Sequence, residues 1–192
     1  MKKISLLGST GSIGVNTLDV VDRNPESFQV LAMSAGSNVD LFAEQVRKFK
    51  PKIASLFDST KISTLKERVA DLDVEIIIGD EGSIAVATLP ETDVVVSGVV
   101  GSAGLVPAME ALKAGKNLAL ANKETLVIAG ELVLKEAEKT NSQIIPIDSE
   151  HSAIFQALNG EKKERIKKII LTASGGPFRS FSLDQMKNVT VK

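Results

Sequence analysis

Short apolar runs alternate with longer amphipathic stretches along almost the whole chain, and this alternation constrains the fold more than any other feature. Runs such as VEIIIG and DVVVSGV are typical of strands buried on both faces. We expect strands at residues 2–7, 28–35, 52–57, 74–79, 93–99, 116–121 and 142–148. We expect helices near residues 13–23, 38–49, 60–71, 81–88, 103–114, 123–139 and 150–158. Strands that alternate with helices of about ten residues or more predict an α/β fold with a doubly wound, mostly parallel sheet.

The pattern changes after Asp148. Residues 158–168, LNGEKKERIKK, are typical of a solvated connector, and the apolar start of KIILTASGGPF predicts a further strand over 168–178. The chain then stops in an amphipathic stretch without an evident cap. We therefore expect two domains, 1–148 and 149–192, the second being the beginning of an α+β domain that is cut short.

Composition narrows the class of protein. The chain has 23 Lys and Arg against 24 Asp and Glu, so its net charge does not favour nucleic acid or an anionic membrane surface. It has no cysteine, which excludes disulfides and thiol chemistry. No apolar run approaches the roughly 20 residues that span a bilayer, and the run after the N-terminal lysines is too short for a signal peptide. We expect a cytoplasmic protein that binds neither nucleic acid nor membrane.

Three glycines, Gly8, Gly11 and Gly14, punctuate the junction between the first expected strand and the first expected helix. Such a junction gathers unpaired N–H groups and the positive end of the helix dipole, and glycine lets a phosphate approach closely. The spacing is G-x-x-G-x-x-G rather than the usual dinucleotide fingerprint, and the stretch lacks the ending of a P-loop. The alternative is a glycine-rich turn that serves only the packing of the strand against the helix. We favour the pyrophosphate of a dinucleotide.

The end of the second expected strand bears on the choice between NAD and NADP. An acidic residue there would bind the ribose 2′-hydroxyl and repel a 2′-phosphate. The chain instead has Gly36, Ser37 and Asn38, with no carboxylate before Asp40, and Asn38 is a candidate N-cap for the next helix. These small polar residues favour NADP, although no Lys or Arg occupies the position.

Polar residues also follow the sixth and seventh expected strands. Asn122, Lys123 and Glu124 follow the sixth strand, where they either line a ligand site or begin a helix, with Asn122 as its N-cap. Asp148 and Glu150, two residues apart at a strand end, either share a divalent cation such as Mg²⁺ or Mn²⁺ or belong to a capping arrangement. A structural role is expected for the single histidine, which has no His or Cys partner for zinc.

A third glycine-containing strand end lies within LTASGGPFRS, residues 171–180. Ser174, Gly175 and Gly176 either form a backbone nest for an anion or make a plain turn before Pro177.

Five stretches, in order, resemble the 1-deoxy-D-xylulose 5-phosphate reductoisomerase family. They are LLGSTGSIGVNTLDVV, AGSN, VVGSAGLVPAMEALKAGKNLALANKETLV, IIPIDSEHSAIFQAL and LTASGGPFR, which run from residue 4 to about residue 179. The resemblance implies an NADPH-dependent, divalent-metal-dependent oxidoreductase of the non-mevalonate isoprenoid pathway. Such an enzyme rearranges 1-deoxy-D-xylulose 5-phosphate and reduces the resulting aldehyde to 2-C-methyl-D-erythritol 4-phosphate. It implies a Rossmann-like NADPH-binding domain at 1–148, a catalytic domain that begins at 149, and a homodimer for the full-length enzyme.

The resemblance also assigns roles to residues. It implies that the cofactor phosphates are contacted by Thr10, Gly11, Ser12 and Ile13. It implies that the 2′-phosphate is surrounded by Gly36, Ser37 and Asn38, and that the reactive end of the cofactor is contacted by Asn122 and Glu124.

The catalytic residues it implies are Lys123, Asp148 and Glu150, with Asp148 and Glu150 as ligands of Mg²⁺, Mn²⁺ or Co²⁺. The residues it implies as substrate contacts are Lys123, Ser149, Glu150 and Ser174.

Two departures from the family pattern matter. Many members carry Lys or Arg where this chain has Ser37, so the charge that holds the 2′-phosphate is weaker or comes from elsewhere. Members are also roughly twice as long, with a third carboxylate ligand, a closing loop and a substrate-phosphate site that this chain lacks. We therefore expect the 192 residues alone to bind NADPH without turning over substrate. The alternatives are another NADP-dependent reductase and a non-catalytic NADP-binding module; a semialdehyde dehydrogenase would need a cysteine.

Overall fold

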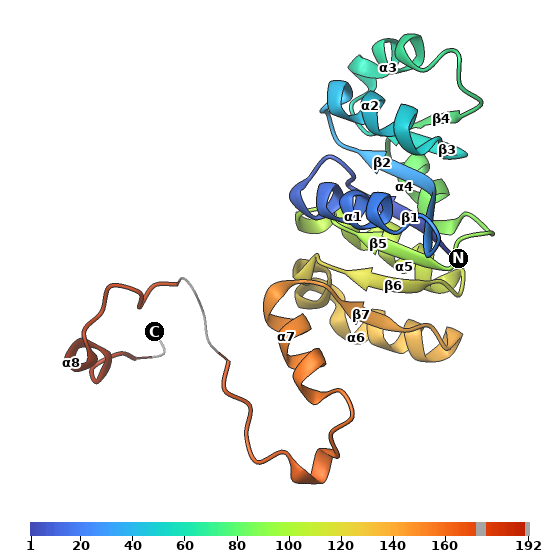
Figure 1. Ribbon diagram of the computed structural model, residues 1–192. Helices are drawn as coiled ribbons and strands as arrows, with labels where there is room; N and C mark the ends of the chain where they lie inside the picture. Colours follow the sequence, from blue (N-terminus) through green and yellow to red (C-terminus); the bar gives the residue numbers. More distant parts are fainter. Residues whose placement is uncertain (172–175, 191–192) are drawn as a thin grey trace. The chain divides into compact units, whose positions relative to one another are not determined.

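A computed structural model of the chain describes residues 1–171 and 176–190 (Figure 1). The chain divides into two compact units, Met1–Asp148 and Ser149–Lys192. The first unit contains the sheet, and the second contains short helices joined by extended chain.

Seven strands form one sheet in the part of the chain that the structure describes. They are β1 (Lys2–Leu7), β2 (Phe28–Ala35), β3 (Ile53–Leu56), β4 (Glu75–Ile78), β5 (Val94–Ser97), β6 (Asn117–Leu120) and β7 (Ile144–Pro146). Their order is β4-β3-β2-β1-β5-β6-β7, and each neighbouring pair is parallel. The sheet is thus parallel throughout, and each strand lies within its predicted range.

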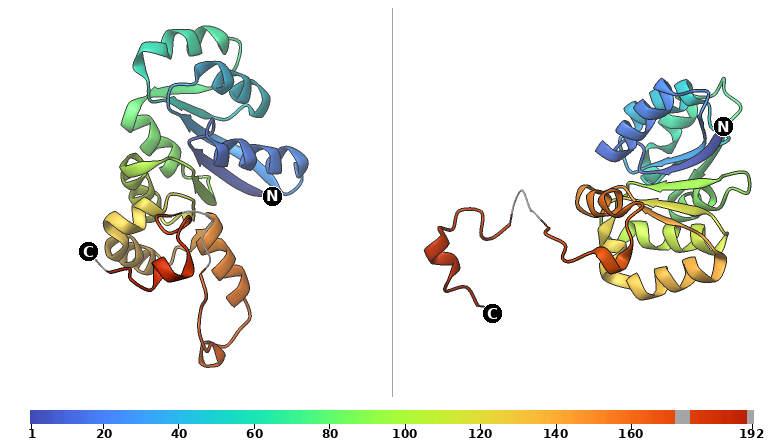
Figure 2. Two further views of the ribbon diagram at one scale, coloured as in Figure 1. Left: turned by 90° about the vertical axis from the view of Figure 1, so that its left-hand side faces the viewer. Right: turned by 60° about the horizontal axis from the view of Figure 1, so that its bottom comes forward.

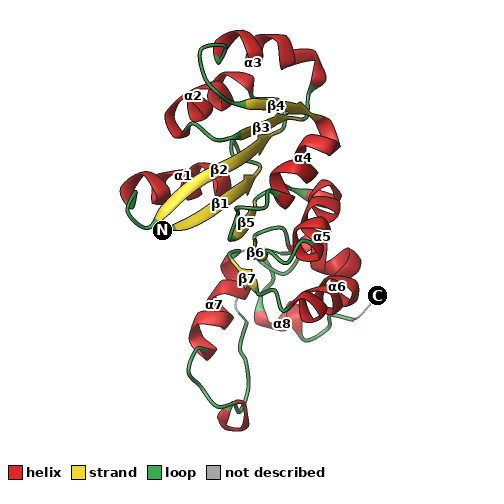
Figure 3. Ribbon diagram, turned by 90° about the vertical axis from the view of Figure 1, so that its right-hand side faces the viewer, coloured by secondary structure: helices red, strands yellow, loops and turns green. Residues whose placement is uncertain are grey.

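Six α-helices connect the strands of the first unit. They are α1 (Ser12–Arg23), α2 (Val39–Phe49), α3 (Ile62–Arg68), α4 (Gly79–Thr88), α5 (Leu105–Lys113) and α6 (Lys123–Thr140). Two 3₁₀ turns, η1 (Ser59–Lys61) and η2 (Gly101–Gly104), precede α3 and α5. Helices α1 to α3 cover one face of the sheet and α4 to α6 the other (Figures 2 and 3). Among the described helices, none combines the length and apolarity needed to cross a membrane.

The two faces of the sheet carry separate hydrophobic cores, because successive side chains of a strand point to opposite faces. Leu6 packs in the core beneath α1 to α3, with Phe42 of α2. Leu7, the next residue, packs in the core beneath α4 to α6, with Leu112 of α5. All of these side chains are fully buried. The inner strands are therefore buried on both faces, and the helices on the two sides of the sheet confirm the prediction of a doubly wound fold.

The second unit contains α7 (Ser149–Leu158), the 3₁₀ turn η3 (Lys163–Arg165) and the short helix α8 (Leu183–Met186). The strand predicted over 168–178 is wrong for its described residues, since 168–171 and 176–178 contain none. An extended segment becomes a strand only when a partner satisfies its backbone hydrogen bonds, and the described part of this unit supplies no partner strand.

Candidate functional site

The glycine turn after β1 is held against the end of β2. The N–H groups of Gly8 and Ser9 donate to the carbonyl oxygen of Ser34 at 3.0 and 2.8 Å. Gly8 has φ +82°, a conformation that L side chains rarely adopt. A Cβ at Gly8 would also lie 3.1 Å from the carbonyl carbon of Gly98, which follows β5. Glycine is therefore required here by backbone conformation and by the approach of a second loop.

Helix α1 begins close to this turn because Gly14 has no side chain. A Cβ at Gly14 would lie 2.3 Å from the carbonyl oxygen of Gly8 and 2.5 Å from the backbone of Ser9. Gly11 is the N-cap residue, and no side chain of the described residues caps the helix there. The first turn, Ser-Ile-Gly-Val, carries no carboxylate. The N–H groups of this turn are thus left for an anion or water, which is the arrangement that suits a phosphate.

The turn lies where the strand order reverses. β1 sits between β2 and β5, so crossovers leave it in both directions, and open α/β sheets bind ligands at the carboxyl ends of the strands at such a point. A cleft of about 170 Å³ occupies this edge of the sheet. It is lined by Ile13, Gly98, Val99, Val100, Ala121, Asn122, Lys123 and Glu124. The predicted residues of the first and sixth strand ends therefore meet in one cleft.

Asn122 has a structural task within this cleft. Its side-chain oxygen accepts from the N–H of Thr125 at 3.3 Å, which makes it the N-cap of α6. Its amide nitrogen donates to the carbonyl oxygen of Gly101 at 2.7 Å, and the residue is only 3% exposed. The capping interpretation of Asn122 is confirmed. Because Asn122 also lines the cleft, capping and contact with a ligand are compatible.

The other predicted residues of this edge differ in exposure. Ser12 and Lys123 are exposed, whereas Thr10, Ile13 and Glu124 are partly buried. Thr10, Gly11 and Ser12 lie outside the lining of the cleft, on the side of the glycine turn. The cleft thus offers an ammonium, a carboxylate and an apolar wall near the start of α1.

The loop after β2 presents polar groups to solvent. Gly36, Ser37 and Asn38 are exposed, and the side chain of Asn38 accepts from the N–H of Leu41 at 3.3 Å, which confirms it as the N-cap of α2. Lys61, at the end of η1, donates from Nζ to the carbonyl oxygen of Ser37 at 2.9 Å. Lys61 was not among the site residues predicted from the sequence. The available signal was that it follows the third expected strand, whose carboxyl end lies next to that of the second in many parallel sheets.

Two carboxylates lie near this loop in the fold, and each has a partner. Asp58 accepts from the N–H and the hydroxyl of Thr60 at 3.1 and 2.6 Å. The hydroxyl hydrogen bond is the main cause that lowers the pKa of Asp58, and the charge of Lys61 acts in the same direction. Asp40, in the first turn of α2, forms an ion pair with Arg68 at 2.6 Å. Asp40 thus has a cationic partner within the protein.

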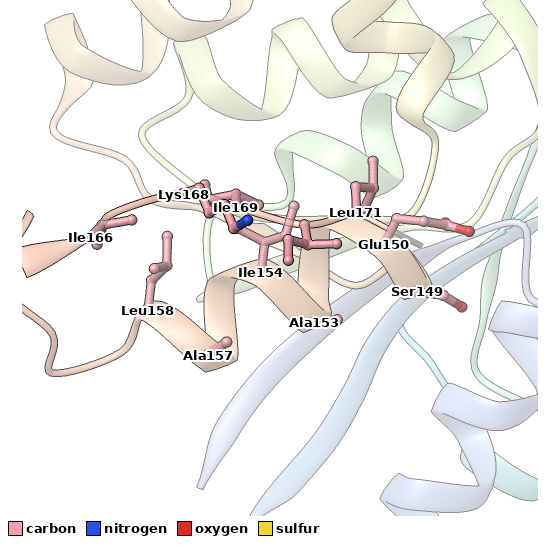
Figure 4. Close-up of a pocket in the computed structure, with 11 residues that line it drawn as sticks. Ser149, Glu150, Ala153, Ile154, Ala157, Leu158, Ile166, Lys168, Ile169 and Leu171 are labelled. Carbon is pink, nitrogen blue, oxygen red and sulfur yellow. The ribbon is translucent and has the colours of Figure 1, made fainter. Parts of the chain in front are cut away.

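The second unit has a cleft of its own, of about 560 Å³, between α7 and residues 166–171 (Figure 4). Its lining is apolar except for Ser149, Glu150 and Lys168. Ser149 and Glu150 lie at the first turn of α7 (Figure 4). Two of the residues predicted to contact substrate thus line one cleft. The predicted substrate residue Ser174 lies outside the described residues.

The predicted metal ligands Asp148 and Glu150 offer carboxylate oxygens, the donor type that Mg²⁺ and Mn²⁺ prefer. Asp148 is the last residue of the first unit and Glu150 belongs to the second. Within residues 1–171 and 176–190, no group of three His, Cys, Asp or Glu side chains is placed to hold a metal ion. The metal assignment remains a prediction.

A parallel sheet with an uncapped, glycine-bounded helix at its switch point defines the class of the protein, a Rossmann-like dinucleotide-binding fold. The family model of 1-deoxy-D-xylulose 5-phosphate reductoisomerase matches residues 4–130, and the model of that enzyme's C-terminal domain matches residues 144–192. The chain belongs to this family.

Curated relatives and solved structures agree with this assignment. The 1-deoxy-D-xylulose 5-phosphate reductoisomerase of Trichlorobacter lovleyi is 50% identical over 192 residues, which are 100% of this chain and 49% of that protein. The enzyme of Desulfitobacterium hafniense is 53% identical over 190 residues, or 99% and 50% of the two chains. This chain thus spans about half the length of the curated relatives it matches.

Two solved structures extend the similarity to the fold. The reductoisomerase from Zymomonas mobilis in complex with NADPH is 39% identical with a TM-score of 0.87, over 98% of this chain and 50% of that one. A reductoisomerase in complex with NADPH, fosmidomycin and magnesium is 39% identical with a TM-score of 0.85, over 99% and 49%.

Proposed function

We propose that this chain is the NADPH-binding part, with the beginning of the catalytic part, of a reductoisomerase that converts 1-deoxy-D-xylulose 5-phosphate to 2-C-methyl-D-erythritol 4-phosphate in isoprenoid biosynthesis. The observation that carries the proposal is the start of α1 at the switch point, which no side chain caps and whose first turn has no carboxylate to oppose an anion. Similarity to reductoisomerases in complex with NADPH and magnesium supports it. In this proposal residues 1–148 bind the nucleotide, and the catalytic domain begins at residue 149.

The nucleotide would lie along the carboxyl edge of the sheet. Its pyrophosphate would meet the start of α1, through the residues Thr10, Gly11, Ser12 and Ile13. Its adenosine end would meet the loop Gly36, Ser37 and Asn38. Its reactive end would enter the cleft lined by Asn122 and Glu124. This direction follows from the strand order, because the ends of β2, β1 and β6 succeed one another along the sheet with β5 between the last two.

Lys123 would donate hydrogen bonds to substrate oxygens, since it lines the cleft and its ammonium is exposed. Asp148 and Glu150 would hold a divalent ion, Mg²⁺, Mn²⁺ or Co²⁺, and Ser149 and Ser174 would bind substrate. When bound, NADPH supplies a hydride, and the ion draws charge from adjacent carbonyl and hydroxyl oxygens as the carbon skeleton rearranges. A homodimer is proposed for the full-length enzyme.

The proposal is tested by titrating the 192-residue protein with NADPH and following binding by calorimetry. Ser12→Glu places a carboxylate in the first turn of α1, where we expect repulsion of the pyrophosphate to weaken binding by about tenfold or more. Ser27→Glu is the matched control, because Ser27 precedes β2 at the amino ends of the strands, whereas the proposed site lies at their carboxyl ends. Equal NADPH affinity in the parent and Ser12→Glu would count against the proposal.

Catalysis by the chain alone is a separate question. Because the chain spans about half of its relatives, we expect it to bind NADPH without oxidising it when 1-deoxy-D-xylulose 5-phosphate and Mg²⁺ are added. Steady NADPH oxidation that depends on the substrate would show that the 192 residues suffice for the reaction.

A further inference from the structure

The end of the proposed nucleotide site that would receive a 2′-phosphate has no cation in its own loop. Gly36, Ser37 and Asn38 are uncharged. A phosphate monoester carries close to two negative charges at neutral pH, and proteins hold such groups with Arg or Lys. If the chain binds NADPH as proposed above, another segment must supply this charge.

The fold brings one lysine to this loop from a separate segment. β3 lies parallel beside β2, with Leu56 opposite Ala35. The pairing continues beyond the strands, since the N–H of Phe57 donates to Ala35 at 2.9 Å and that of Asp58 donates to Gly36 at 3.0 Å. The chain then turns through η1 and ends at Lys61, whose ammonium donates to the carbonyl oxygen of Ser37.

The position of Lys61 is fixed by ordered local structure. Asp58 caps η1 through its hydrogen bonds with Thr60, so the turn that carries Lys61 is tied at its start as well as to the β2 loop. An ammonium has three donors. One donates to Ser37, which leaves two for a ligand at this exposed position.

We infer that Lys61 is the specificity-determining residue that pairs with the 2′-phosphate of NADPH in this chain. The inference rests on the proposed function and adds to it the source of the charge. The competing arrangement uses Asp58, whose carboxylate would accept from the ribose hydroxyls of NADH and repel a 2′-phosphate. Lys61 is favoured because its ammonium contacts the β2 loop directly, whereas Asp58 is engaged by Thr60 and contacts that loop through its backbone N–H.

The test compares NADPH with NADH, and adenosine 2′,5′-bisphosphate with adenosine 5′-monophosphate, in the parent and in Lys61→Met. Each pair of ligands differs only by the 2′-phosphate. We expect Lys61→Met to weaken NADPH and the bisphosphate by about ten- to a hundredfold, while NADH and the monophosphate change less than about twofold. Lys61→Arg should restore most of the preference, because it keeps the charge. Lys135→Met, on α6 at the opposite face of the sheet, is the control for loss of one positive charge.

The possible failures are distinguishable. If the parent binds neither NADPH nor NADH, the proposed function fails and the inference with it. If the parent binds NADPH but Lys61→Met keeps the same preference over NADH, the inference alone is overturned. If Lys61→Met loses affinity equally for NADPH and NADH, Lys61 only stabilises the loop at Ser37. If the parent prefers NADH, Asp58 is the favoured partner of the ribose. Each of these two results overturns the inference about Lys61.

Discussion

The substitution Gly14→Ala places a methyl group where α1 crosses the glycine turn. The new Cβ would lie 2.3 Å from the carbonyl oxygen of Gly8, whereas real Cβ atoms essentially never come within 3.0 Å of a neighbour. The helix or the turn would have to move by about 0.7 Å, and the opposing atoms are backbone that cannot rotate away.

The expected magnitude has two opposing contributions. Overpacking costs about 1–3 kcal/mol, and a contact with backbone places this site near the upper value. Replacing glycine by alanine within a helix returns about 1 kcal/mol through helix propensity. We therefore expect a net loss of about 2 kcal/mol in the free energy of unfolding, or about 4–8 °C in Tm for a chain of this size. NADPH affinity should fall as well, because the moved residues form the start of α1.

Urea unfolding of the parent and variant measures the loss, and Gly130→Ala is the matched control. Gly130 lies within α6 beside a kink at Ala129, and a Cβ there would meet no atom closer than 3.9 Å. This control should gain up to about 1 kcal/mol. If Gly14→Ala is as stable as Gly130→Ala, α1 does not pack against the glycine turn so closely that a methyl group is excluded.

Three further substitutions test separate parts of the account. Gly11→Ala should change stability by less than about 1 kcal/mol, since Gly11 has φ −77° and its nearest contact would be 3.5 Å, yet it should weaken NADPH in calorimetry by placing a methyl group in the path of the phosphate. Gln45→Leu should cost about 1 kcal/mol in urea unfolding, because the buried Gln45 side chain donates to the carbonyl oxygen of Ser9 at 2.9 Å. Asp71 forms a two-point pair with Arg47, and that hydrogen bond is the main cause of its lowered pKa. Asp71→Asn should therefore destabilise the protein at neutral pH, and the difference should vanish as the pH falls below about 4 and through the lowered pKa of Asp71. Unchanged NADPH affinity in Gly11→Ala or an unchanged unfolding curve in Gln45→Leu would contradict these expectations. So would a stability difference between Asp71→Asn and the parent that does not depend on pH.

The sequence predicted the sheet well because its inner strands β3, β2, β1, β5 and β6 are largely buried, whereas the outer strands β4 and β7 are partly exposed. A short apolar run such as residues 94–96 has few other structures available between two amphipathic helices, and β5 contains it. The run that starts at 168 shows the limit of this reasoning. Residues 169–171 are apolar, but 168–171 have no strand to pair with in the described chain and join no sheet.

The candidate site was predictable where the chemistry follows a strand end directly. The glycine turn, Asn122 and Lys123 could be placed in this way, and the cleft at the switch point contains the last two. Lys61 follows the third strand but was harder to place, because it lies 24 residues from Ser37 along the chain and meets it only through the pairing of β2 with β3. Contacts of this kind depend on strand order, which a single sequence leaves open.

A crystal structure of the chain with NADPH would show whether the start of α1 holds the pyrophosphate. We expect phosphate oxygens within hydrogen-bonding distance of the N–H groups of Ser12 and Ile13. A nucleotide bound elsewhere, or protein atoms hydrogen-bonded to those N–H groups in the complex, would contradict it.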